Sequence, residues 1–195
     1  LPSGLRELTF GASFNQSLAR VRLPTELRQL TLGDDFNQPL HDVVFPAGLR
    51  SLTLGYCFDH PLRDVRLPDG LHTLKLGHSF NAPLQEVQLP RGLRALELGS
   101  CFNLPLRGVA FPESLESLRL GFYFDRPLQD AILPQGLLAL TLGYAFDQPL
   151  QGVAWPAQLR RLSLGRSFNR SLAGVVWPPR LQSIVFGAQF NQPLD

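Results

Sequence analysis

Histidine, cysteine and aspartate are the residue types in this chain that could bind a metal or take part in proton transfer. The sequence contains four histidines, at His41, His60, His72 and His78. They fall at four different positions of the 22-residue repeat that runs through the chain, so stacked repeats would point them in different directions. The sequence also lacks a phosphate-binding glycine motif. We therefore expect no metal site, no cofactor and no catalytic residue, and we predict that the chain is not an enzyme.

Two cysteines share one position of the repeat. Cys57 and Cys101 lie two repeats apart. Strand spacing would separate their Cα atoms by about 9–10 Å, which exceeds the ~7 Å limit for a disulfide. We therefore predict two free thiols, which favour a reducing, intracellular compartment.

The element that would position these residues is a short repeat without insertions or deletions. An apolar residue followed by proline recurs every 22 residues, and this apolar residue is taken as position 1. In every repeat, leucine occupies positions 5 and 18, glycine position 11 and phenylalanine position 14. The repeats begin at Leu1, Leu23, Phe45, Leu67, Leu89, Phe111, Leu133, Trp155 and Trp177. A fixed period of this length indicates a solenoid.

The conserved spacing within the repeat predicts the elements of each coil. Positions 5 to 10 read L-x-x-L-x-L, which predicts a strand with positions 8 and 10 on one face. One 22-residue unit cannot bury its leucines alone, so the units must stack about 4.8 Å apart. Glycine at position 11 permits either an unusual backbone angle or a close approach. Asparagine or aspartate at position 15 can bond the amides of a corner.

We therefore predict an all-β solenoid of nine coils, similar to leucine-rich repeats, as a single domain over residues 1–195. The parallel sheet lies on the concave side. Prolines at positions 2 and 17 favour an extended or polyproline-like convex side with little or no α-helix. A short second strand around Val21–Leu23 has room to form there.

The motifs resemble those of a known family. Phe-Asn-Gln-Pro-Leu occurs at 36–40 and 190–194, and Phe-Asp-Gln-Pro-Leu at 146–150. Together with L-x-x-L-x-L-G and Leu-Pro, these segments resemble the FNIP repeat, a 22-residue variant of the leucine-rich repeat. The resemblance covers the whole chain, with aspartate replacing asparagine at three places. It implies a solenoid fold and protein interaction, and it names no catalytic residue. Members of the family are sometimes joined to F-box or kinase domains.

Charge and hydropathy limit the classes of partner. The formal net charge is +2, which is too small to favour nucleic acid. No apolar run approaches the ~20 residues of a transmembrane helix. The chain also contains no methionine, so we expect it to be part of a longer protein or of a multi-subunit assembly. After Asp147 the only acidic residue is Asp195, whereas several arginines form a predicted basic end patch that would either face an acidic partner or remain solvated. These arginines are Arg160, Arg161, Arg166, Arg170 and Arg180.

Variable positions beside the strand leucines are candidates for binding. Positions 7, 9 and 12 are predicted to project from the concave face, and the middle repeats place aromatic and charged residues there. Such a composition is typical of interface centres. The predicted partner-binding residues are Tyr56, Lys75, His78, Glu97, Arg119, Phe122, Tyr123 and Tyr144. The alternative is that position 12 is a tolerant corner whose rings cover the edge of the core.

The opposite side of the coil supports a rival interpretation. Position 22 changes from Arg22 and Arg66 to apolar residues in the C-terminal half. An apolar stripe that points outward often marks a contact. Two hypotheses therefore stand: a protein-binding module that uses its concave face, and a structural or linker subunit held in a complex by its ends and convex face.

Overall fold

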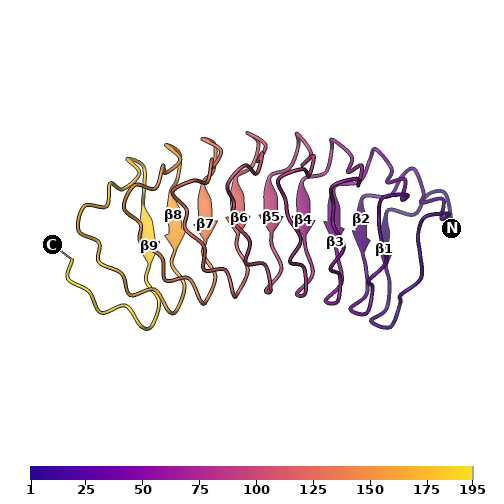
Figure 1. The fold of residues 1–195 in the computed structure, drawn as a ribbon. Coiled ribbons are helices and arrows are strands. Elements are labelled where there is room, and N and C mark those ends of the chain that lie inside the picture. Colours follow the sequence, from indigo (N-terminus) through magenta and orange to yellow (C-terminus); the bar gives the residue numbers. More distant parts are fainter. Residues whose placement is uncertain (195) are drawn as a thin grey trace.

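Each repeat contributes one three-residue strand. The computed structural model describes residues 1–194. Every strand occupies positions 7 to 9 of its repeat, as the leucine spacing predicted (Figure 1). The strands are β1 Glu7–Thr9, β2 Gln29–Thr31, β3 Ser51–Thr53, β4 Thr73–Lys75, β5 Ala95–Glu97, β6 Ser117–Arg119, β7 Ala139–Thr141, β8 Arg161–Ser163 and β9 Ser183–Val185.

The strands form one parallel sheet in sequence order, from β1 to β9. The register pairs residues 22 apart, for example Leu52 with Leu74 and Leu74 with Leu96. Residues at the same repeat position are therefore spatial neighbours along the whole solenoid. Within residues 1–194 there is no helix, and the all-β, leucine-rich-repeat-like class is confirmed.

The predicted second strand around Val21–Leu23 is wrong. The backbone there is irregular, because the Val21 N–H turns back to the carbonyl of Leu18 at 2.9 Å. Pro24 follows directly and has no N–H to offer a neighbouring coil.

The core runs through the middle of the stack as a set of columns. Positions 5, 8, 10, 14, 18 and 21 are buried in the inner coils, whereas positions 7 and 9 face outward. In the fifth coil the buried side chains are Leu93, Leu96, Leu98, Phe102, Leu106 and Val109. Full burial of each such side chain contributes about 1.5–3 kcal/mol. Because every coil lies against the next, these columns merge into one continuous core.

The phenylalanine column shows which way the solenoid bends. Along position 14 the ring centroids of adjacent coils lie 6.0–6.3 Å apart. Paired strands are only about 4.8 Å apart. The coils therefore diverge away from the sheet, which places the strands on the concave side, as predicted. Trp155 and Trp177, also away from the strands, have the same wide spacing of 6.4 Å.

Glycine at position 11 is required by space and not by backbone angle. From Gly33 to Gly187, a Cβ atom at this position would lie 1.7–2.1 Å from the carbonyl oxygen of the preceding coil's glycine. None of these glycines has a positive φ, which among the described residues occurs only at Gly108, Gly152 and Gly174. Adjacent coils therefore approach each other most closely just after the strands.

Candidate binding surface on the sheet face

The Asn/Asp column at position 15 has a structural role between coils. In each of the first eight coils, the side-chain Oδ1 accepts the backbone N–H of position 15 in the next coil, at 2.9–3.1 Å. Aspartate and asparagine perform this role equally, since only the acceptor oxygen is used. Among residues 1–194, no three histidine, cysteine or acidic side chains gather as a metal site would require. Cys57 and Cys101 are free thiols, as predicted.

The middle of the sheet face carries three charged side chains in a row at position 9. The Lys75 ammonium lies 3.5 Å from the Glu97 carboxylate, and the Arg119 guanidinium lies 3.9 Å from the same carboxylate. All three side chains are about half exposed, so these ion pairs contribute little to stability. They do hold three charged groups in a defined pattern across β4, β5 and β6.

Position 12, in the turn that follows each strand, carries stacked rings. Tyr56 stacks on His78 with 4.2 Å between centroids and nearly parallel planes. Phe122 stacks on Tyr144 at 4.4 Å. The Arg166 guanidinium lies over the Tyr144 ring at 5.4 Å, which extends the second stack by one coil.

Tyr123 lies beside the second stack, with its ring 4.9 Å from Phe122 in an edge contact. The residues Tyr56 and Tyr123 are each 52% exposed, and Phe122 is 43% exposed. These aromatic side chains are much more accessible than the buried phenylalanine and leucine columns of the core. The eight predicted partner-binding residues therefore fall into two sets, the charged trio on the strands and the rings at positions 12 and 13 in the turn that follows each strand.

The five C-terminal arginines occupy five different positions around the coil. Arg161 lies on the sheet face in β8, and Arg166 joins the ring stack. Arg170 pairs with the Asp147 carboxylate at 3.0 Å, and Arg180 donates to the Gln158 side chain. The structure therefore distributes these arginines around the coil, and only some of them border the aromatic surface.

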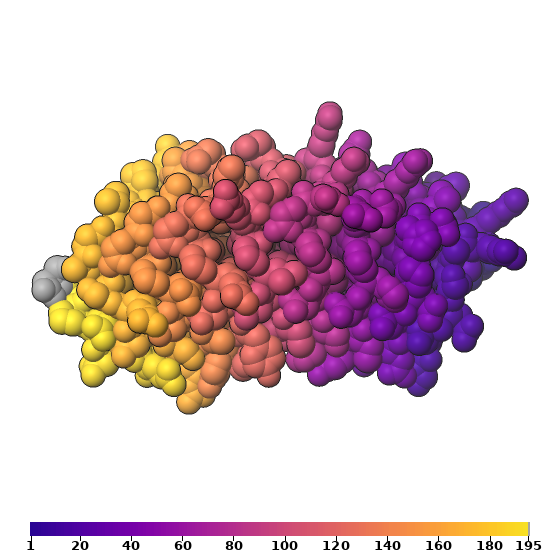
Figure 2. Space-filling model, viewed as in Figure 1, coloured from indigo at the N-terminus to yellow at the C-terminus, as the bar shows by residue number. Residues whose placement is uncertain are grey.

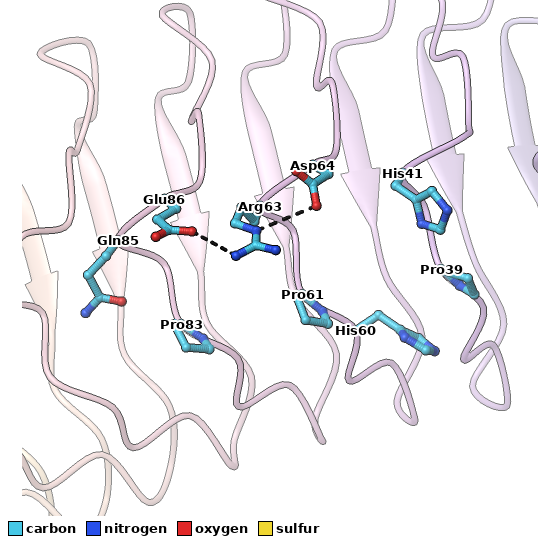
Figure 3. Close-up of a pocket in the computed structure, with 9 residues that line it drawn as sticks. All are labelled: Pro39, His41, His60, Pro61, Arg63, Asp64, Pro83, Gln85 and Glu86. Atoms are coloured by element: carbon cyan, nitrogen blue, oxygen red, sulfur yellow. Dashed lines mark hydrogen bonds and ion pairs between the residues drawn. The ribbon is translucent and has the colours of Figure 1, made fainter.

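The sequence alone did not reveal a pocket on the side away from the strands. It has a volume of about 680 Å³ and spans the second to fourth coils (Figure 3). Its lining residues are Pro39, His41, His60, Pro61, Arg63, Asp64, Pro83, Gln85 and Glu86. Arg63 lies between two carboxylates, 3.2 Å from Glu86 and 3.6 Å from Asp64. The hydrogen bond to Glu86, followed by the charge of Asp64, raises the pKa of Arg63 above its usual value.

This pocket lies where a recurrent glutamine contact is missing. At position 19, Gln85, Gln129 and Gln151 each donate their Nε2 to two carbonyls of the next coil. His41 and Arg63 replace glutamine in the second and third coils and make no such contacts. The carbonyl oxygens of positions 17 and 19 in the third and fourth coils therefore receive no such hydrogen bond from position 19 of the preceding coil. Comparison of the repeats at position 19 shows that His41 and Arg63 are successive replacements, whereas Arg107 replaces glutamine singly in the fifth coil.

The side away from the strands also exposes single apolar residues at position 22. Val44, Ile132 and Val176 are 79%, 77% and 82% exposed. They confirm that this position points outward. Among the described residues, no helix has the length and apolar character that crossing a membrane would require. Figure 2 shows the coils as one continuous elongated body.

Comparison with known families identifies the repeat. A model of the FNIP repeat matches at residues 1–35, 14–57, 36–79, 58–101, 80–123, 102–145 and 124–167. The chain belongs to the FNIP repeat family. A search of curated proteins finds no match.

A solved structure shares the architecture of this FNIP-repeat chain. CroV588, described as a circular leucine-rich-repeat protein, is 34% identical, with a TM-score of 0.80. The match covers 100% of this chain but only 32% of CroV588. The nine coils therefore span about a third of the length of that protein.

Proposed function

We propose that this FNIP-repeat chain is a non-catalytic module that binds a partner protein through the concave face of its sheet. Solenoid folds of this kind are typical of protein-interaction modules, because stacked coils present one long surface. The observation that carries the proposal is the row of stacked rings at position 12, in the turns after the strands, together with the charged trio at position 9. Aromatic residues with a few charges are typical of the energetically dominant part of an interface.

These side chains are already held in place by contacts with one another, which supports the proposal. Tyr56 and Tyr144 are already held in stacks, and Lys75 and Arg119 are held by Glu97. Binding a partner would therefore fix few additional side-chain rotamers, which lowers the entropic cost of association. We assign no catalytic role to any residue. An intracellular, reducing location stays a prediction, and the free thiols of Cys57 and Cys101 support it.

A second candidate function is that of a structural subunit held through the side away from the strands. The unbroken apolar run at position 22 from Ala110 to Val176 favours it, with Ile132 and Val176 77% and 82% exposed, because an outward apolar stripe often marks a contact. The CroV588 match agrees with either function, since a long stack of coils can serve as a frame or as a binding surface.

The test is site-specific photocrosslinking in lysate of the native source. A photoreactive residue replaces Thr73 on the sheet face, and the captured protein is identified by mass spectrometry. In the background of Tyr56→Ala, Phe122→Ala and Tyr144→Ala, capture of that same protein should fall while the melting temperature stays close to wild type, because all three rings are exposed.

The matched control replaces Val44, Ile132 and Val176 with alanine on the other side of the coil. This control should leave capture unchanged if the concave face is the binding surface. Capture that survives the three aromatic substitutions but is lost in the control would refute the proposal and favour the structural subunit.

A further inference from the structure

Position 12 presents a planar side chain in five of six successive coils. From the third to the eighth coil the residues are Tyr56, His78, Ser100, Phe122, Tyr144 and Arg166. Five of them belong to the two stacks described above. The fifth coil alone has no planar group, so Ser100 leaves a gap one coil wide between His78 and Phe122.

We infer that this gap receives an aromatic side chain of the partner protein, which inserts over Ser100 and joins the two stacks. The inference rests on the proposed function and identifies the group that the concave face recognises. In its bound position the partner's ring would have His78 on one side and Phe122 on the other. The result is a single column of rings that runs from Tyr56 to the Arg166 guanidinium.

The spacing of the coils sets the width of the gap. Two coil steps separate position 12 of the fourth coil from that of the sixth, which is about 9.6 Å at a strand spacing of about 4.8 Å. A ring midway would lie about 4.8 Å from each neighbour, within the 4.5–7 Å range of favourable aromatic pairs. The stacks on either side already have centroid distances of 4.2 and 4.4 Å. The gap therefore accommodates one ring, and two rings would not fit.

The surroundings favour a ring that carries a hydrogen-bond donor. Ser100 lies partly covered at the base of the gap, and its hydroxyl makes no side-chain hydrogen bond within residues 1–194. Glu97, three residues earlier in the same coil, keeps its carboxylate on the sheet face between Lys75 and Arg119. Both groups are hydrogen-bond acceptors, which suit the phenol O–H of tyrosine or the indole N–H of tryptophan. We therefore favour tyrosine or tryptophan over phenylalanine.

The test introduces an aromatic residue of this protein into the gap by substitution. Ser100→Tyr places an aromatic side chain between His78 and Phe122, where an external ring would otherwise insert. The probe is 5-fluoroindole, followed by fluorine NMR as protein is added. Wild type should shift the probe signal in a saturable manner, and Ser100→Tyr should bind it about tenfold more weakly, because two aromatic contacts are lost.

Two control variants distinguish blocking of the gap from nonspecific effects of a substitution on probe binding. Ser100→Ala keeps the gap open but removes one hydrogen-bond acceptor, so it should lose only a few-fold in probe affinity, less than Ser100→Tyr loses. Ser167→Tyr adds a ring at position 13 of the eighth coil, a position where Tyr123 shows that a tyrosine is accommodated. It should leave probe binding unchanged. The melting temperature of Ser100→Tyr should equal or exceed that of wild type, since the added ring extends an existing stack.

Some results would overturn the inference: no saturable shift with wild type, equal probe binding by Ser100→Tyr, or a clearly lower melting temperature for that variant. The last result would show that the gap does not hold a ring. The crosslinked partner distinguishes this failure from failure of the proposed function. If Ser100→Tyr leaves capture intact while the three alanine substitutions abolish it, the concave face binds the partner without using the gap.

Discussion

Replacement of one glycine should separate neighbouring coils. In Gly99→Ala, the new Cβ would lie 1.8 Å from the Gly77 carbonyl oxygen, whereas real Cβ atoms stay at least 3.0 Å from such an atom. The fourth and fifth coils must therefore move apart by about 1.2 Å at this corner, the difference between those two distances. The hydrogen bond from the Cys101 N–H to the His78 carbonyl is 2.8 Å long and lies at the same corner. A shift of that size would break it.

The expected cost follows from the contacts that this separation disturbs. Loss of one or two backbone hydrogen bonds at about 1 kcal/mol each, together with looser packing of the leucine and phenylalanine columns, gives about 3 kcal/mol. Gly11→Ala is the matched control, because a Cβ there meets nothing within 4 Å. It should be neutral or stabilise by up to about 1 kcal/mol, since alanine restricts the unfolded chain.

A third variant distinguishes space from backbone angle. Gly108 has a φ of +75° but nothing closer to its added Cβ than Gln85 at 3.6 Å. Gly108→Ala should therefore cost about 1–2 kcal/mol through backbone strain alone. Urea denaturation measures all three variants, and amide exchange at Cys101 reports local opening. If Gly99→Ala and Gly11→Ala have equal unfolding free energies, close approach does not explain the glycine column.

Other substitutions test the remaining contacts between coils. Asn103→Ala removes the acceptor of the part-buried Asp125 N–H and should lower the urea-derived unfolding free energy by about 1–2 kcal/mol, whereas Asn103→Asp should stay near wild type. Phe102→Ala should cost about 3–5 kcal/mol, because the ring is fully buried; a loss below 1 kcal/mol would contradict the continuous core. Arg107→Gln places a glutamine between those of the adjacent coils and should add about 0.5–1 kcal/mol by donating to the Pro127 and Gln129 carbonyls; thermal melts that show no gain would count against the glutamine contacts.

The repeat made most of the fold predictable, because one correct register determines every coil. The strand at positions 7–9, the parallel order and the inward leucines follow from the period alone. The same logic failed at Val21–Leu23, where it allowed a second strand that does not form. A strand there would need backbone donors that face the next coil, but Val21 donates within its own coil and Pro24 cannot donate. Local turn hydrogen bonds outweighed the apolar pattern.

The candidate surface was predictable as a set of columns but not as contacts. Once the register is known, Lys75, Glu97 and Arg119 must be neighbours, so their pairing could have been foreseen. The direction of the rings at position 12 could not, since it depends on side-chain rotamers that the period does not specify. The pocket beside Arg63 was missed for another reason. It coincides with two successive coils that lack glutamine at position 19, at His41 and Arg63, and such an absence is visible only when all repeats are compared.

Two adjacent residues, Gly99 and Ser100, have different expected roles, the first in stability and the second in binding. Gly99 lies where coils approach most closely, and its replacement should destabilise the stack without altering any exposed ring. Ser100 follows directly, and its replacement by tyrosine should preserve the stack and obstruct the binding surface. The difference arises because position 11 faces the preceding backbone, whereas position 12 faces solvent between stacked rings. Opposite effects on melting temperature and probe binding at neighbouring positions cannot come from general destabilisation, so this pair would separate a binding role from a structural one.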